Sequence, residues 1–211
     1  MSGDVNPGDL YRTARERIVA LVSANGVEPG LVVPATPEWT VHDVVAHVAG
    51  VARDVVSGNM PGAPGDQWTA AQVDRGRGQS IPDLLVPWAH DGPMLDQLFG
   101  GADGGMMAAA VFDIHSHEAD LRHALGLVVA IPADFLGWAA PQMRDSFHAA
   151  VATRGLPAVQ LDIGEVDWFR GRLGRRSEAE VRAYPWSVDP SPYLDIFFIF
   201  GRAEQSLGEI A

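Results

Sequence analysis

Apolar residues recur with the period of an α-helix along most of the first 155 residues of this chain, which has 211 residues in all. The pattern predicts five helices, over residues 8–25, a segment that begins at Thr40, and residues 81–99, 105–125 and 133–154. Amphipathic helices bury their apolar faces by packing against one another. Residues 1–155 are therefore predicted to form a helical bundle.

The ends of these helices carry sequence signals of their own. Asp43 lies three residues after Thr40, in the position that completes a capping box at a helix N-terminus. Gly26, Gly126 and Gly155 follow the first, fourth and fifth segments, where a glycine commonly ends a helix. These signals support the boundaries that the apolar period predicts.

Two stretches interrupt the helical pattern. Residues 57–80 hold many glycines and prolines, and a connection of this length either contains a short helix, predicted at residues 68–75, or forms a flexible cover over the open end of the bundle. Pro87 and Pro93 fall inside the third predicted helix, which we expect them to kink or to restart.

The pattern changes after residue 155. Residues 158–163 and 166–170 alternate apolar and polar side chains, as strands do, with a turn at Gly164 and Glu165. Residues 193–207 predict a closing helix. Residues 156–211 are therefore predicted to form a small α/β domain within a mainly α chain. The four arginines in residues 170–176 are interpreted as part of a solvated turn rather than a nucleic-acid site.

The composition excludes several classes of function. With no cysteine, the chain has no disulfide scaffold, thiolate metal site or cysteine nucleophile. Its 15 basic residues, all arginine, stand against 27 acidic ones, and the net charge of −12 disfavours nucleic-acid binding. No apolar run approaches the roughly 18 residues of a membrane span, and the first residues lack the layout of a signal peptide. We expect a soluble cytoplasmic protein that depends on histidine, carboxylates, arginine or a bound cofactor.

The fourth predicted helix carries ionisable residues on one face. At about 100° per residue, Asp113, His117 and Asp120 share a face with small and apolar neighbours, whereas Glu118 and Arg122 point to an exposed face. A carboxylate and a histidine four residues apart can reach one ion, because their Cβ atoms stand about 5–6 Å apart. A divalent metal would satisfy this pair, and a surface ion pair or a hydrogen-bonded core histidine would explain the same spacing.

Three segments together resemble a known family. The sequence PEWTVHDVVAHVAG, which ends at Gly50, and the sequence DIHSHEADLRHALG, which ends at Gly126, resemble the metal-binding segments of the mycothiol-dependent maleylpyruvate isomerase family, within the DinB-like superfamily. The late Gly-Arg pair that contains Arg202 resembles the family's C-terminal segment. The agreement in order and layout covers nearly the whole chain. It implies a DinB-like up-down helical bundle followed by a small α/β domain.

The resemblance implies that His47, Asp113 and His117 bind a divalent metal. Two histidines and a carboxylate suit zinc, the first choice, and do not exclude Fe²⁺, Mn²⁺ or Ni²⁺. The family's acid is typically glutamate, so the shorter Asp113 implies a small backbone shift, a different binding mode or a bridging water. Asp120 is a candidate for orienting His117. Arg202 matches an arginine that faces the family's active site, and is a candidate for binding a carboxylate of the substrate or of the thiol.

The implied activity uses mycothiol, an actinobacterial thiol, as a low-molecular-weight cosubstrate. Addition of its sulfur to a small electrophile gives either cis–trans isomerisation or an S-conjugate, and the sequence does not choose between an isomerase and an S-transferase. No nucleic-acid or membrane partner is expected, and a monomer and a homodimer are both open. Two other functions stay open: a non-catalytic ligand-binding or interaction module, and a hydrolase or dehydratase that uses metal-bound water.

Overall fold

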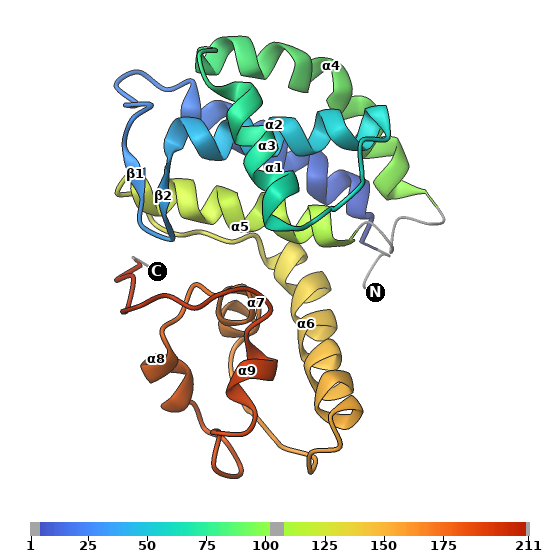
Figure 1. The fold of residues 1–211 in the computed structure, drawn as a ribbon, viewed down its shortest axis with the longest axis vertical. Helices are drawn as coiled ribbons and strands as arrows, with labels where there is room; N and C mark the ends of the chain where they lie inside the picture. Colours follow the sequence, from blue (N-terminus) through green and yellow to red (C-terminus); the bar gives the residue numbers. More distant parts are fainter. Residues whose placement is uncertain (1–4, 102–107, 210–211) are drawn as a thin grey trace. The chain divides into compact units, whose positions relative to one another are not determined.

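The computed structural model describes residues 5–101 and 108–209, and it divides into two compact units. The first unit extends to residue 130 and the second covers residues 131–209 (Figure 1). The sequence pattern placed this division at residue 155. The difference concerns α6 (Ala133–Thr153), which packs against α7 (Glu165–Arg172) and so belongs to the second unit.

The first unit is a helical bundle with one small hairpin. Its elements are α1 (Pro7–Val22), β1 (Val32–Val33), β2 (Thr36–Thr40), α2 (Val41–Ser57), α3 (Asp66–Gly76), α4 (Ile81–Gly100) and α5 (Ala108–Ala124). The predicted helices are confirmed here, the short helix α3 included. The part of the predicted fourth helix at residues 105–107 lies outside the described residues. The antiparallel hairpin within the proline-containing loop was not predicted.

The capping box and the predicted ends at Gly126 and Gly155 are also confirmed. The first helix ends earlier than predicted, because α1 stops at Val22 with Ser23, rather than Gly26, as its C-cap. The Thr40 hydroxyl accepts the N–H of Asp43, and the Asp43 carboxylate accepts the N–H of Thr40, which completes the capping box of α2. Gly126 and Gly155 follow α5 and α6 with φ of 69° and 67°, a left-handed conformation that glycine adopts without strain. Pro87 lies within α4, which continues through it without restarting.

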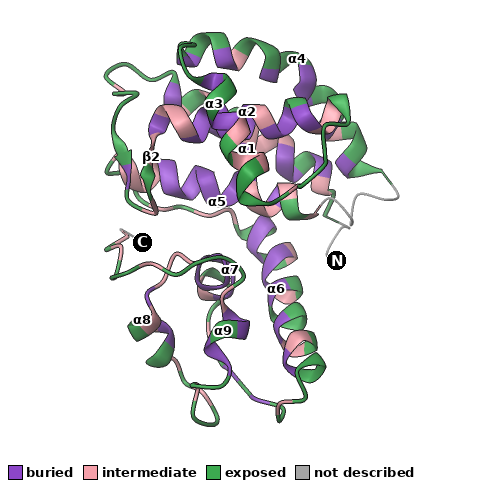
Figure 2. Ribbon diagram, viewed as in Figure 1, coloured by how far each residue is buried: buried purple, intermediate pink, exposed green. Residues whose placement is uncertain are grey.

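The core of the first unit lies where α1 and α2 pack against α4 and α5 (Figure 2). Tyr11 on α1 is completely enclosed, and its hydroxyl accepts a hydrogen bond of 3.2 Å from Trp88 Nε1 on α4. Its ring meets Phe99 edge to face, with centroids 4.9 Å apart. One turn before Tyr11, Gly8 on α1 lies against the backbone of Asp96 on α4. The two helices therefore approach closely at the N-terminal end of α1.

The second unit is helical rather than α/β. Besides α6 and α7 it contains α8 (Glu178–Arg182) and α9 (Leu194–Phe197), and its described residues form only isolated bridges and no paired strands. The strand predicted at residues 166–170 is wrong, since this segment lies in α7. Trp168 and Phe169 are both buried, whereas adjacent residues of a strand point to opposite faces. The helix predicted at residues 193–207 shortens to α9.

The arginine-rich segment is not a solvated turn. Arg170 and Arg172 lie in α7 and are both buried. Arg170 forms an ion pair with Glu209, and Arg172 Nη1 donates to the carbonyl oxygens of Ile196, at 2.9 Å, and Phe197, at 3.1 Å. These arginines tie the chain of the second unit to itself, so the interpretation of this segment as a solvated turn is wrong.

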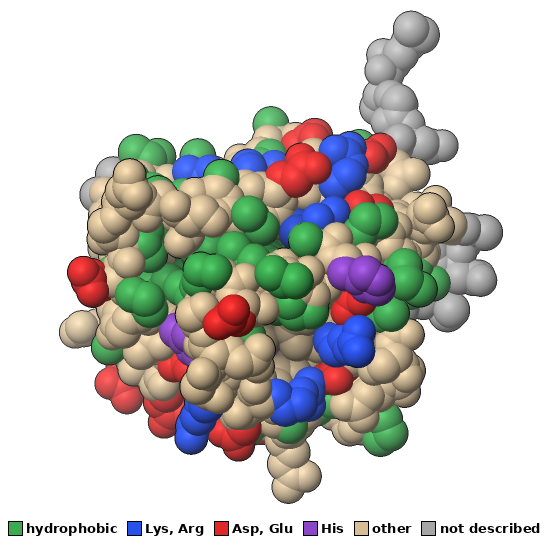
Figure 3. Space-filling model, turned by 90° about the horizontal axis from the view of Figure 1, so that it is seen from above, with side chains coloured by type: hydrophobic (Ala, Val, Ile, Leu, Met, Phe, Trp, Pro, Cys, Tyr) green, Lys and Arg blue, Asp and Glu red, His purple; other side chains and the backbone are tan. Residues whose placement is uncertain are grey.

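Among the described residues, none of the helices has the length and apolar character needed to cross a membrane. Basic side chains on the face shown in Figure 3 lie interspersed with acidic ones and form no continuous patch among the side chains described there.

We expect Gly8→Ala to lower the free energy of unfolding by about 1–3 kcal/mol. A Cβ atom at this position would lie 2.0 Å from the carbonyl oxygen of Asp96 on α4, so the helices would have to separate. Urea titration followed by circular dichroism measures the change. Gly137→Ala is the matched control, because Gly137 lies inside α6 with open space at its Cβ position. Wild-type stability of Gly8→Ala would contradict this close approach of α1 and α4.

Candidate metal centre

Three ionisable side chains from two helices of the first unit meet at one point. His47 comes from α2, and Asp113 and His117 come from α5. One potential ligand atom of each lies within 4.8 Å of the others. His47 Nε2 is 3.2 Å from Asp113 Oδ2, and His117 Nε2 is 3.4 Å from Asp113 Oδ1. The structure therefore brings together the three residues that the sequence identified as metal ligands.

The helix faces explain this meeting. The valines of α2 enter the core and place His47, at the edge of that face, against α5, where it is 4% exposed. On α5, the four-residue spacing puts Asp113 and His117 one above the other. The His117 side chain is 6% exposed, whereas that of Asp113 is 35% exposed. The cluster is thus enclosed on the histidine side and open to solvent at the carboxylate.

The charges of the cluster stabilise one another. Burial by itself would raise the pKa of Asp113, but the nearby imidazoles of His47 and His117 outweigh it and hold that pKa far below its usual range. Burial by itself would lower the pKa of His117, but the carboxylates of Asp113 and Asp120 outweigh it and raise this pKa to about 9. In the metal-free protein, Asp113 is therefore ionised and His117 carries a proton at neutral pH.

Asp120 lies behind His117, on the side away from Asp113. It is completely enclosed, and its Oδ2 is 3.2 Å from His117 Nδ1. A carboxylate at this nitrogen favours a proton on Nδ1 and leaves Nε2 to face Asp113. The geometry fits the role of orienting residue that the sequence suggested for Asp120.

A second set of polar residues holds His47, and the sequence analysis missed it. Gln72 on α3 places its Oε1 2.8 Å from His47 Nδ1 and its Nε2 2.9 Å from Asp54 Oδ2. Asp54 also accepts hydrogen bonds from Arg75 Nη2, at 2.7 Å, and Asn59 Nδ2, at 2.8 Å. Asp54 follows His47 by seven residues, or about two helical turns, so a search for acids on the histidine's own face would have found it.

Trp39 on β2 covers one side of the two imidazoles. Its ring centroid lies 5.1 Å from that of His47 and 5.8 Å from that of His117. The two imidazoles meet edge to face, with centroids 5.1 Å apart. The unpredicted hairpin therefore contributes an aromatic wall to the site, which limits the access of water from this side.

The residues present fit a divalent metal ion. In a tetrahedral zinc site with bonds of about 2.0–2.1 Å, neighbouring ligand atoms stand about 3.3 Å apart. The two distances from the Asp113 oxygens to His47 and His117 already have this size, at 3.2 and 3.4 Å. The other nitrogen of each ring faces Gln72 or Asp120, so both Nε2 atoms are directed at the same point. The shorter side chain of Asp113 reaches both histidines.

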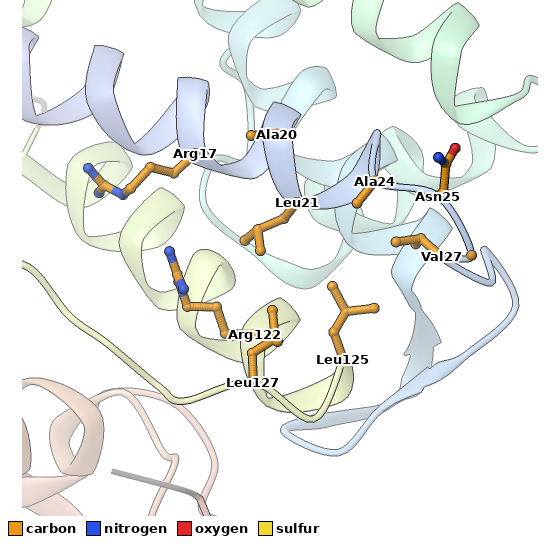
Figure 4. A pocket seen from close by; sticks show the side chains of 10 residues that line it. Arg17, Ala20, Leu21, Ala24, Asn25, Val27, Arg122, Leu125 and Leu127 are labelled. Carbon is orange, nitrogen blue, oxygen red and sulfur yellow. The ribbon is translucent and has the colours of Figure 1, made fainter.

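The opposite face of α5 differs from the sequence expectation. Glu118 is buried rather than exposed, and it accepts hydrogen bonds of 2.8 Å from Arg17 Nε on α1 and 3.1 Å from Arg122 Nε. The two arginines flank a hollow of about 440 Å³ whose other walls include Leu21 and Leu125 (Figure 4). This hollow shares no residue with the histidine cluster, so it is a separate feature of the first unit.

Arg202 lies in the second unit, where two carboxylates hold its guanidinium group. It forms an ion pair with Glu178 and places Nη2 3.4 Å from Asp195 Oδ1. Its guanidinium carbon lies 5.4 Å from the ring centroid of Phe198. The role suggested for Arg202 at the metal centre stays a prediction.

The fold and the cluster define a class of protein: a helical bundle in which two histidines and one carboxylate, side chains of the kinds that ligate metal ions, meet within 4.8 Å of one another. The chain matches the family model of the mycothiol maleylpyruvate isomerase N-terminal domain over residues 11–122. The match covers more than half of the chain and includes His47, Asp113 and His117, and the chain belongs to this family. No curated protein and no solved structure matches the chain.

We expect the stability of the metal-free protein to fall as the pH rises from about 6.5 to about 9. The pKa of His117 is higher in the folded protein than its ordinary value of 6.5, so its contribution is complete below 6.5 and is lost as the pH passes about 9. Urea titrations in the presence of a chelator measure this dependence. His117→Gln should flatten it, and a rise in the stability of the wild type over this range would contradict the assignment.

Proposed function

We propose that this chain is a divalent-metal-dependent and mycothiol-dependent enzyme that acts on a small electrophile, as an isomerase or an S-transferase. The observation that carries the proposal is the convergence of His47, Asp113 and His117 on one point. The family to which the chain belongs is named for mycothiol and for maleylpyruvate isomerisation. The family match and the cluster coincide, because all three residues lie in the matched segment.

His47, Asp113 and His117 would hold the ion. A divalent cation bound there stabilises the thiolate form of a coordinated thiol, which is the nucleophilic form. Two neutral imidazoles and one carboxylate suit Zn²⁺. Three ligands from the protein would leave a position for an outside ligand, as catalytic sites require. The partly exposed side chain of Asp113 makes this cluster accessible from solvent.

The side chains around the ligands have separate tasks. Asp120 and Gln72 contact the outer nitrogens of the two histidines and fix the directions of their rings. Trp39 excludes water from one side and offers an apolar surface to a bound molecule. We propose Arg202 as a second-unit group that binds a carboxylate of the substrate or of the thiol, since a guanidinium group pairs with carboxylates in a bidentate manner.

The absence of cysteine suits this chemistry. The chain has no cysteine, so none of its own side chains offers a thiol that could compete for the metal. In the proposed reaction the sulfur comes from the cosubstrate. Release of the thiol after addition gives an isomer of the electrophile, and retention of the thiol gives an S-conjugate. Both products belong to the proposal.

We expect the wild type to bind one divalent ion per chain and His117→Ala to lose that binding. The loss should exceed the roughly 10–100-fold that removal of an outer hydrogen-bond partner causes, because His117 is a ligand itself. Metal analysis of protein purified without added metal, followed by calorimetric titration with Zn²⁺, measures both. His90→Ala is the matched control, because His90 is an exposed histidine of the same unit. A wild type that neither contains nor binds metal would overturn the proposal.

We expect turnover to require both the metal and the thiol. The metal-loaded wild type is tested with mycothiol and a panel of unsaturated acids and other small electrophiles, and the products are separated by chromatography. Chelation, omission of the thiol and His117→Ala should each abolish turnover. Turnover with metal and without thiol would instead establish the hydrolase or dehydratase, and metal binding without turnover of any member of the panel would favour the ligand-binding module.

A further inference from the structure

The contacts of Gln72 determine which way its amide group points. Its two ends lie between His47 and the carboxylate of Asp54, and its side chain is almost completely enclosed. Asp54 forms an ion pair with Arg75, and an ionised carboxylate only accepts hydrogen bonds. The NH₂ group of Gln72 must therefore face Asp54, and its carbonyl oxygen must face His47.

The direction of the amide in turn determines the proton position on His47. A carbonyl oxygen also only accepts hydrogen bonds, so Nδ1 of His47 carries the proton and donates it to Gln72 Oε1 over 2.8 Å. With the Nδ1–H group donating to Gln72, Nε2 is left either to donate a proton to the carboxylate of Asp113 or to bind a metal ion. This is the nitrogen that stands 3.2 Å from Asp113 and faces the proposed metal position.

Gly50 makes room for this contact. It lies on α2 one turn after His47, where the backbones of α2 and α3 approach each other. A Cβ atom at Gly50 would lie 2.7 Å from Cβ and 2.9 Å from Cγ of Gln72. Any larger residue would push Gln72 away from His47, so the glycine of the His-Val-Ala-Gly segment acts on the histidine through α3.

We propose that Gln72 is a positioning residue that holds His47 as the Nδ1–H tautomer, with Asp54 orienting its amide and Gly50 admitting it. The link to metal binding rests on the proposed function, whereas the proton on Nδ1 of His47 is a property of the metal-free protein. The partner of His47 is a neutral amide, and the partner of His117 is the carboxylate of Asp120. The two ligands are thus directed at one point by groups of different charge.

Nitrogen-15 NMR of the metal-free protein tests directly whether Nδ1 of His47 carries the proton. We expect the His47 signals of the wild type to show the Nδ1–H form, with assignment by their disappearance in His47→Gln. Asp54→Leu removes the oxygen that accepts from Gln72 and Arg75, so the Gln72 amide can turn and a mixture of tautomers is expected. The Nε2–H form in the wild type, or an unchanged tautomer in Asp54→Leu, would overturn the proposal.

Metal titration then tests the consequence. Gln72→Met keeps a side chain of similar length without hydrogen-bonding groups, and we expect it to weaken Zn²⁺ binding by about 10-fold or more. Gln67→Met is the matched control, since Gln67 is exposed on the same helix. Gly50→Ala displaces Gln72, so it should both produce a mixture of His47 tautomers and weaken Zn²⁺ binding. Wild-type affinity in Gln72→Met would overturn the positioning role.

The two proposals fail in different ways. A wild type that shows the Nδ1–H tautomer but binds no Zn²⁺ would overturn the proposed function and leave the tautomer assignment standing. A wild type that binds Zn²⁺ and shows the Nε2–H tautomer would overturn the role of Gln72 and leave the metal centre standing. Circular dichroism of each variant establishes that it is folded before its tautomer or affinity is compared.

Discussion

The site depends on one electrostatic arrangement, the carboxylate of Asp113 between the imidazoles of His47 and His117. Removing such groups from water is costly unless each finds a partner of opposite charge or a hydrogen bond. Here a single carboxylate contacts both rings, at 3.2 and 3.4 Å, and it stays ionised because they surround it. The same three groups are the ligands that a divalent ion needs. A proton on His117 and a metal ion are therefore alternative ways of balancing the charge of this cluster.

Contacts to the Nδ1 atoms of the two histidines fix the directions of their rings. Two imidazoles near a carboxylate can rotate, and either nitrogen can point inward. Asp120 behind His117 and Gln72 behind His47 remove that freedom, and Trp39 covers the rings from the side. Asp120 comes from α5, Gln72 from α3 and Trp39 from β2. Two of these elements, α3 and β2, lie in stretches that the sequence pattern presented as connections, and both serve to orient the candidate ligands. This explains why a short helix lies within the glycine-rich stretch between α2 and α4.

Several corrections share one cause. The helical period of α5 correctly grouped Asp113, His117 and Asp120, but it placed Glu118 on an exposed face. Glu118 is buried because Arg17 on α1 forms a hydrogen bond with it. These two residues are more than 100 positions apart in the sequence. Likewise, residues 166–170 alternate like a strand, and they form a helix because Trp168 and Phe169 must both enter the core of the second unit. Local periodicity reports the face of an element, and the partners of that face come from elsewhere in the chain.

The sequence by itself determined the helical character of the first unit, its caps at Thr40 and Gly126, and the shared face of Asp113 and His117. These features are local, because a helix face, a capping box and a four-residue spacing depend only on nearby residues. The third candidate ligand, His47, came from the resemblance to the family. Only the tertiary structure decided that α6 belongs to the second unit, that α3 brings Gln72 to His47, and that Trp39 covers the site. Those contacts join residues far apart in the chain, and their distances are set by how the helices pack rather than by the pattern of any one segment.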